Sequence, residues 1–254
     1  MISTPQGRAR ARHDTGFWFS TPNGVAAELA AARGFGYAVL DLEHGAFDQS
    51  ALDLFIPLCR ALGLRVMAKV LGPQAEAIQQ ALDFGADGVI VPHVLDIDHA
   101  RAVCAHASYP PRGDRSYAAG RIVGYGKPPT GFFAAENERV ICLPMIESAQ
   151  ALRDVELILA LETVDGVFVG PTDLALSRGR SEYVFNGEDQ RDIERIAVAA
   201  RAAGKPWVLP AWSPAERSFA AAHGASWTVV VDERGALVAG LDGFLDRLQQ
   251  ERAA

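Results

Sequence analysis

The sequence predicts a single (β/α)8 barrel spanning residues 1–254. The chain is close in length to the roughly 250 residues that such a barrel takes. Eight short apolar runs alternate with eight longer helical patterns, and no internal linker separates them. The runs are continuously apolar, as expected for parallel strands buried on both faces of a sheet. A doubly wound open sheet is the alternative, but no G-x-G-x-x-G pattern follows the first run.

The predicted strands and helices alternate along the chain. Strands are expected at 17–20, 37–44, 65–70, 88–94, 139–147, 166–174, 207–212 and 226–233. Helices are expected at 24–34, 50–63, 73–85, 96–108, 148–161, 188–203, 214–223 and 235–251. Their ends carry the usual signals, with Ser50 as an N-cap, Gly63 as a C-terminal stop and Pro73 in a first turn.

Residues 109–138 interrupt this alternation. The segment is rich in Pro, Gly and Arg, and it is too long for an ordinary connection within a compact domain. Because irregular loops of this length are usually functional, we expect a long active-site loop here.

Composition excludes several classes of partner. The net charge of −7 and the absence of a Lys/Arg-rich run argue against a nucleic-acid surface, although small anionic substrates stay possible. The cysteines, Cys59, Cys104 and Cys142, have neither disulfide nor metal spacing, which suits a reducing cytoplasm. The N-terminus lacks the apolar stretch of a signal peptide, and no run approaches the roughly 20 apolar residues that a membrane span needs.

Polar side chains gather near the carboxyl ends of the predicted strands, where barrels of this type hold their active sites. In strand order they are Asp41, Glu43 and His44, then Lys69, His93, Glu147, Asp173, Trp212 and Asp232. Any one of them could simply begin a solvated loop. The ends of all eight strands meet at one rim, however, so the set as a whole predicts a functional site.

Glu147 and Asp173 follow neighbouring predicted strands. Two carboxylates in this position suit a hard divalent cation bound through oxygen, with further coordination positions left for water or substrate. They could instead act as an acid–base pair without a metal.

Five segments resemble the HpcH/HpaI family of class II, metal-dependent 2-keto-3-deoxy-sugar-acid aldolases, which are related to the citrate lyase β-subunit. The segments are DLEHGAFD (41–48), ALDFGADGVIVPHV (81–94), YPPRGDRS (109–116), LPMIESAQAL (143–152) and VDGVFVGPTDLALSRG (164–179). The resemblance extends from Phe17 to about Leu248. It implies a (β/α)8 barrel whose last helix packs on a neighbouring subunit, in trimer-based hexamers. It also implies an Mg²⁺, Mn²⁺ or Co²⁺ ion and reversible cleavage of a 4-hydroxy-2-keto acid to pyruvate and an aldehyde.

The resemblance also implies roles for single residues. It makes Glu147 and Asp173 the metal ligands, His44 the general base and Asp41 the carboxylate that orients His44; a purely structural His44 is the alternative. The remaining implied contacts are the backbone of Gly170, Pro171, Thr172 and Asp173 for the pyruvyl carboxylate, Asp83 for a neighbouring subunit's site, and Trp18 as an aromatic near the first strand.

Three positions depart from the family pattern. Lys69 stands where the family has an arginine that grips the keto oxygen and carboxylate, Met145 where it often has glutamine, and His93 where an apolar residue is expected. We expect Lys69 to bind the substrate carboxylate as a catalytic and binding residue. The alternatives are a surface lysine paired with a nearby acid, and a Schiff-base lysine.

The predicted loop carries a local cluster of positive charge. Arg112, Arg115 and Arg121 give this cluster within an acidic chain. Arg115 could recognise an anionic aldehyde or the distal carboxylate of the substrate, or the arginines could hold the loop through ion pairs.

Pyruvate aldol cleavage is the first choice of function, and two others stay open. One is condensation or cleavage of another 2-keto acid, such as a citrate-synthase-like reaction with oxaloacetate. The other is a catalytically silent barrel used as a binding or assembly subunit.

We predict that pyruvate binds weakly to the unaltered protein, because an ammonium group cannot hold a carboxylate and a keto oxygen as a planar guanidinium does. Lys69→Arg should bind pyruvate more tightly, by on the order of 1–3 kcal/mol if a charge-assisted hydrogen bond is recovered, and should cleave the aldol faster. Calorimetric titration with pyruvate measures this. Strong pyruvate binding by the unaltered protein together with lost activity in Lys69→Arg would show that the lysine is a specific adaptation. Borohydride trapping tests the Schiff base separately.

Overall fold

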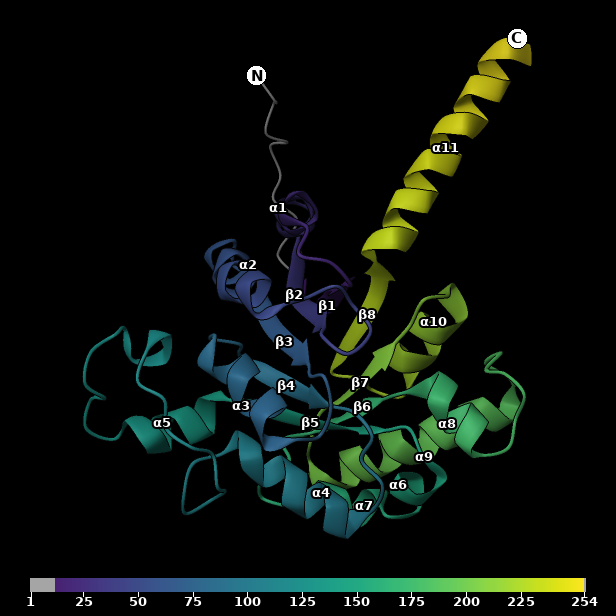
Figure 1. The fold of residues 1–254 in the computed structure, drawn as a ribbon. Helices are drawn as coiled ribbons and strands as arrows, with labels where there is room; N and C mark the ends of the chain where they lie inside the picture. Colours follow the sequence, from purple (N-terminus) through teal and green to yellow (C-terminus); the bar gives the residue numbers. More distant parts are fainter. Residues whose placement is uncertain (1–11, 254) are drawn as a thin grey trace.

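Eight parallel strands close into a barrel in the computed structural model, which describes residues 12–253 (Figure 1). Each strand pairs with its neighbours in chain order, and β1 closes the barrel on β8. The strands are β1 (Arg12–Phe19), β2 (Phe35–Asp41), β3 (Arg65–Lys69), β4 (Gly88–Val91), β5 (Ile141–Ile146), β6 (Val167–Val169), β7 (Trp207–Pro210) and β8 (Trp227–Asp232). The (β/α)8 prediction is therefore confirmed.

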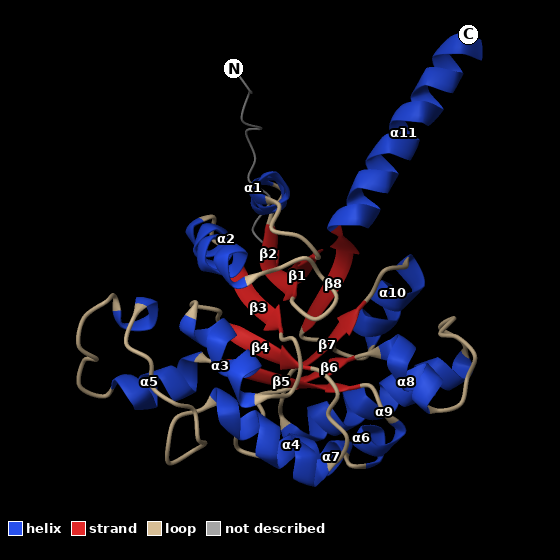
Figure 2. Ribbon diagram, in the orientation of Figure 1, coloured by secondary structure: helices blue, strands red, loops and turns tan. Residues whose placement is uncertain are grey.

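Helices surround the strands (Figure 2). They are α1 (Gly24–Ala32), α2 (Gln49–Ala61), α3 (Ala75–Asp83), α4 (Ile97–Cys104), α5 (Phe132–Arg139), α6 (Ala149–Arg153), α7 (Val155–Leu159), α8 (Pro171–Ser177), α9 (Gly187–Ala203), α10 (Pro214–Ala222) and α11 (Glu233–Ala253). Two short 3-10 helices, η1 (Ala105–Ala107) and η2 (Arg121–Val123), lie between α4 and α5. No helix in this part of the chain is long and apolar enough to cross a membrane.

Side chains fill the barrel, so it has a packed core rather than a channel. The buried interior cluster consists of Tyr37, Val39, Met67, Ile90, Leu143, Met145, Phe168, Val208 and Val229. A larger apolar cluster lies between the strands and the surrounding helices. Any binding site must therefore be built on the rim or on the outer surface.

Strand register brings the polar residues of the rim together. Asp41 pairs with Lys69 across β2 and β3, and Ile146 pairs with Val169 across β5 and β6. All four residues lie at the carboxyl ends of their strands. The loops that follow, including the one that begins at Glu147, therefore start at the same level of the rim.

The predicted strand at 166–174 is only partly correct. β6 ends at Val169, and Pro171 occupies the first turn of α8, where a missing N–H costs nothing. Asp173 consequently lies in the first turn of a helix and not on a strand. The predicted loop at 109–138 likewise omits α5, which begins at Phe132.

The segment 109–138 lies at the end of the barrel opposite the expected active site. α4 returns the chain to the amino ends of the strands, and the segment leads from there into β5. Arg112 in this segment donates to Asp165 at 2.7 Å, two residues before β6 begins. The segment therefore does not border the carboxyl-end rim of its own chain, and its role as an active-site loop stays a prediction.

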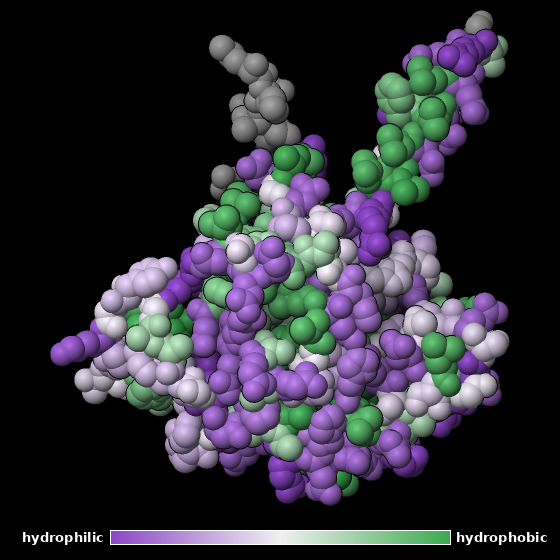
Figure 3. Space-filling model, in the orientation of Figure 1, coloured by the Kyte–Doolittle hydropathy of each residue, from purple (hydrophilic) through white to green (hydrophobic). Residues whose placement is uncertain are grey.

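α11 projects away from the barrel instead of folding back onto it (Figure 1). None of its residues is buried, and apolar side chains lie along it (Figure 3). The large ones are Leu237, Val238, Leu241, Phe244 and Leu245, each more than half exposed.

Candidate active site

Lys69 forms a buried ion-pair cluster with two acids from the neighbouring strand and loop. Its Nζ atom contacts Glu43 Oε2 and lies 3.4 Å from Asp41 Oδ1. The side chains are only 7% exposed for Lys69, 8% for Asp41 and 9% for Glu43. Removing one partner of such a group leaves an uncompensated buried charge, so each of the three depends on the others.

Glu43 is ionised in this cluster. Burial alone would raise the pKa of its carboxyl, but the hydrogen bond and charge of Lys69, together with His93 and His44, hold that pKa below its ordinary value. An ionised carboxylate only accepts hydrogen bonds. The nitrogen atoms that contact Glu43 are therefore the donors.

The turn after β2 presents His44 to solvent. Asp41 Oδ1 accepts the backbone N–H of His44 at 3.1 Å, and the Gly45 N–H donates to the Asp41 carbonyl. A Cβ on Gly45 would lie 2.2 Å from that carbonyl oxygen, so only glycine fits the turn. The His44 side chain is 70% exposed, and its Nε2 lies 3.4 Å from Glu43 Oε1.

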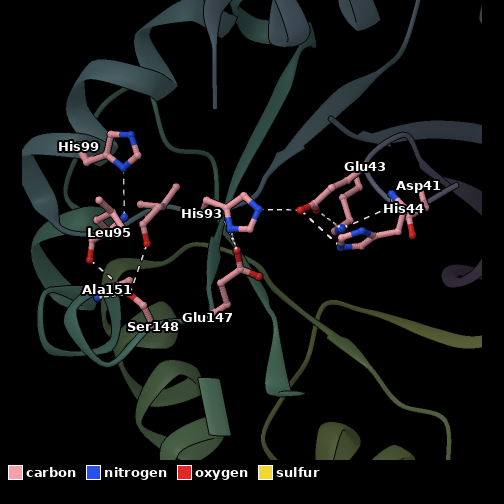
Figure 4. A network of polar contacts seen from close by, with 11 residues as sticks. Asp41, Glu43, His44, His93, Leu95, His99, Glu147, Ser148 and Ala151 are labelled. Carbon is pink, nitrogen blue, oxygen red and sulfur yellow. Dashed lines mark hydrogen bonds and ion pairs between the residues drawn. The ribbon is translucent and has the colours of Figure 1, made fainter. Parts of the chain in front are cut away.

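His93 connects the two sides of the rim (Figure 4). Its ring Nε2 lies 2.6 Å from Glu43 Oε1, and its backbone N–H donates to Glu147 Oε1 at 2.5 Å. The residue has a φ of 58°, in the left-handed region. His93 thus contacts both the Lys69 cluster and the carboxylate at the end of β5.

Glu147 and Asp173 form a pair of carboxylates that no Lys or Arg side chain of the described residues contacts. Burial raises the pKa of Glu147, the N–H of His93 opposes this rise, and the negative charge of Asp173 adds to it. A Cβ on Gly170 would lie 2.7 Å from Glu147 Oε2, so the glycine leaves room for this oxygen. Within residues 12–253, neither Glu147 Oε2 nor the Asp173 carboxylate has a hydrogen bond or ion pair.

This pair fits a divalent cation. Glu147 is buried and Asp173 beside it is exposed, so the two negative charges repel each other and one of them is poorly solvated. A doubly positive ion would offset both unfavourable effects. The described residues contain no group of three or more His, Cys, Asp and Glu side chains placed to hold a metal. The protein would supply two oxygen ligands, and the other positions would fall to water and substrate.

The model of the HpcH/HpaI aldolase/citrate lyase family matches residues 14–223. The chain belongs to this family. It is 33% identical over 237 residues to the 2-keto-3-deoxy-L-rhamnonate aldolase of Salmonella typhi, covering 91% of this chain and 87% of that protein. Membership makes the chain an aldolase-type lyase, and this argues against the catalytically silent barrel.

Solved structures share the fold of this HpcH/HpaI family member. Citrate synthase SbnG is 24% identical with a TM-score of 0.84, and 94% of each chain is covered. An HpcH/HpaI aldolase from Desulfitobacterium hafniense DCB-2 is 22% identical with a TM-score of 0.85, and 92% of each chain is covered. At these identities the likeness concerns the barrel itself.

Most of the predicted site residues lie on the carboxyl-end rim of the barrel. Asp41, His44 and Lys69 lie on one side, and Glu147 lies across from them, connected through Glu43 and His93. Gly170, Pro171, Thr172 and Asp173 form the start of α8 beside Glu147. Trp18 at the end of β1 contacts the Phe168 and Trp212 rings at centroid distances of 6.2 and 6.3 Å, which gives the rim an aromatic side.

Arg115 and Asp83 lie elsewhere. The Arg115 side chain is fully buried, donates to Asp83 Oδ1 at 2.8 Å, and stacks 4.7 Å from the centre of the Tyr109 ring. Asp83 ends α3, the helix that returns the chain to the amino end of β4. Arg115 therefore does not reach the rim of its own chain. This agrees with the alternative that ion pairs hold the segment.

Two contacts differ from the sequence-based expectations. Asp41 contacts the backbone of His44, while the carboxylate nearest to the His44 ring is Glu43, to which no role was assigned. Lys69 is paired with acids, as one alternative supposed, but it is buried and not at the surface. An arginine has five N–H donors and could serve both acids and still reach a ligand, so Lys69→Arg stays a useful test.

Proposed function

We propose that this protein is a divalent-metal-dependent aldolase that reversibly cleaves a 4-hydroxy-2-keto acid to pyruvate and an aldehyde. The observation that carries the proposal is the pair of carboxylates Glu147 and Asp173 on a rim that also holds His44 and Lys69. Within the described residues, Glu147 Oε2 and the Asp173 carboxylate have no hydrogen-bond or ion-pair partner. The similarity to a 2-keto-3-deoxy-L-rhamnonate aldolase supports a sugar-acid substrate.

Glu147 and Asp173 would hold Mg²⁺, Mn²⁺ or Co²⁺. When bound, such an ion acts as a Lewis acid that stabilises the negative charge formed beside a keto group. In the cleavage direction the C3–C4 bond breaks while the 4-hydroxyl gives up its proton, and the resulting enolate takes a proton at C3 to become pyruvate. His44 is the proposed acceptor of the hydroxyl proton, because its ring is exposed on the rim and imidazole is the commonest general acid–base group of enzymes.

The substrate would be held by several groups around this centre. The backbone at Gly170, Pro171, Thr172 and Asp173 is proposed to receive the pyruvyl carboxylate. Lys69 would add positive charge, although Asp41 and Glu43 already share its ammonium group. Trp18 would contact the aldehyde portion, and Asp83 is proposed to serve the site of a neighbouring subunit.

A second candidate is a reaction with another 2-keto acid, such as a citrate-synthase-like condensation with oxaloacetate. The observation that favours it is the pairing of the Lys69 charge with Asp41 and Glu43, which leaves Lys69 a weaker binding group for pyruvate than an arginine would be.

We also propose that the protein works in a reducing cytoplasm. Within the described residues the three cysteines are free and buried, which is consistent with such a compartment.

Removal of the metal tests the proposed chemistry. We expect a chelator to abolish aldol cleavage and Mg²⁺, Mn²⁺ or Co²⁺ to restore it, because Glu147 and Asp173 provide only part of a coordination shell. Release of pyruvate, coupled to a dehydrogenase, measures the reaction, and elemental analysis confirms metal removal. Full turnover of a verified metal-free protein would contradict the proposal.

Loss of the proposed base is a second test. His44→Ala should lower kcat by roughly 10²–10⁴-fold, the usual range for an acid–base group, without loss of folding. His99→Ala is the control: the half-buried His99 lies on α4, away from the ion-pair cluster, its ring accepts the Leu95 N–H, and the variant should keep its activity. Near-normal cleavage by His44→Ala would remove this residue from the mechanism.

We also propose that α11 packs on a neighbouring subunit, within a trimer-based hexamer. A groove on the outside of the barrel, lined by Phe17, Val25, Leu29, Phe35 and Val231 among others, lies beside the start of α11. Within residues 12–253, nothing covers the groove or the apolar side chains of α11. Apolar surfaces of this kind usually mark an interface.

Substitution on α11 tests this assembly. Leu241→Asp with Phe244→Asp should shift the protein to smaller species, because burying two carboxylates in an apolar contact is strongly unfavourable. Light scattering after size-exclusion chromatography measures the mass. Gln249→Asp with Gln250→Asp adds the same charge to the same helix and should leave the mass unchanged. An unchanged mass in both variants would argue against the proposed interface.

A further inference from the structure

His93 adopts a backbone conformation that its surroundings must hold in place. Its φ of 58° lies in the left-handed region, which residues other than glycine rarely occupy. The residue lies in the short connection between β4 and α4, directly after Pro92. Such a conformation persists where neighbouring contacts fix it, and it is often found at functional sites.

The ring of His93 provides one of those contacts. Nε2 lies 2.6 Å from Glu43 Oε1, and the other oxygen of Glu43 is bound by Lys69. Because Glu43 is an ionised acceptor, the ring nitrogen donates this hydrogen bond. The buried ion pair therefore anchors a side chain that is otherwise 61% exposed.

The backbone of His93 provides the second contact. Its N–H donates to Glu147 Oε1 at 2.5 Å, whereas the ring Nδ1 lies 3.7 Å from the same oxygen, beyond hydrogen-bond distance. One oxygen of Glu147 is thus occupied, and Oε2 faces the space left by Gly170. The N–H decides which oxygen is presented to a cation.

We propose that His93 is a positioning residue for the metal site: its ring, anchored on Glu43, holds the left-handed backbone that directs the N–H at Glu147. This inference rests on the proposed function, in which Glu147 and Asp173 bind a divalent ion. His93 does not touch the ion; it fixes the orientation of a ligand, and it joins the Lys69 cluster to the metal site. Groups behind metal ligands typically change affinity by about 10–100-fold when they are lost.

The test is the affinity of the chelator-treated protein for Mn²⁺ alone, measured from the electron paramagnetic resonance signal of the free ion. His93→Val lacks the ring and strongly disfavours a positive φ, so its dissociation constant should rise by about 10–100-fold. His93→Gly also lacks the ring but adopts the left-handed conformation freely, so its affinity should lie between those of His93→Val and the unaltered protein.

Two further variants make the result unambiguous. Tyr125→Gly removes another non-glycine residue with a positive φ, 63°, from a position that is 77% exposed, and should bind Mn²⁺ like the unaltered protein. Glu147→Gln should lose most of the affinity. Wild-type affinity in both His93 variants, with weak binding by Glu147→Gln, would overturn the role of His93 alone. Wild-type affinity in Glu147→Gln would overturn the metal site itself, and the positioning role with it.

Discussion

The ion pairs of the buried Lys69 ammonium group hold the rim of this barrel together. Asp41 and Glu43 both lie against it, so three side chains that would each be costly to bury alone are stable as a group. The consequences extend outward from Glu43. One of its oxygens is fixed by Lys69, which leaves the other to contact His44 and His93. The positions of His44 and His93 therefore depend on the Lys69 ammonium group, although neither histidine contacts it.

The same rim carries an excess of negative charge. Among the described lysines and arginines, Lys69 alone contacts any of Asp41, Glu43, Glu147 and Asp173. An anionic 2-keto acid would be repelled from such a surface unless a cation joined it. A divalent ion would therefore have two effects, because it balances the ligands and also makes the rim attractive to substrate.

Much of this organisation could be predicted from the sequence, and the reasons are physical. The continuous apolar runs predicted the strands and their order, and the polar residues near the ends of most runs predicted the rim. Which side chains of the rim contact one another could not be predicted, because these contacts depend on side-chain conformations and backbone angles that one sequence does not reveal. The contact of Asp41 with a backbone N–H, and the φ of His93, are of this kind. The sequence left two roles open for Arg115 for another reason: it did not show that the connection before β5 lies at the amino end of the barrel, where Arg115 pairs with Asp83.

The outward course of α11 has a consequence for how the molecule behaves in solution. Apolar surface on this helix and in the neighbouring groove is stable in water only when something covers it. If a second copy does so, unfolding also separates subunits, and the midpoint of thermal unfolding rises with protein concentration. Dilution would then act as a mild denaturant, and a stability measured at one concentration would not describe the protein at another.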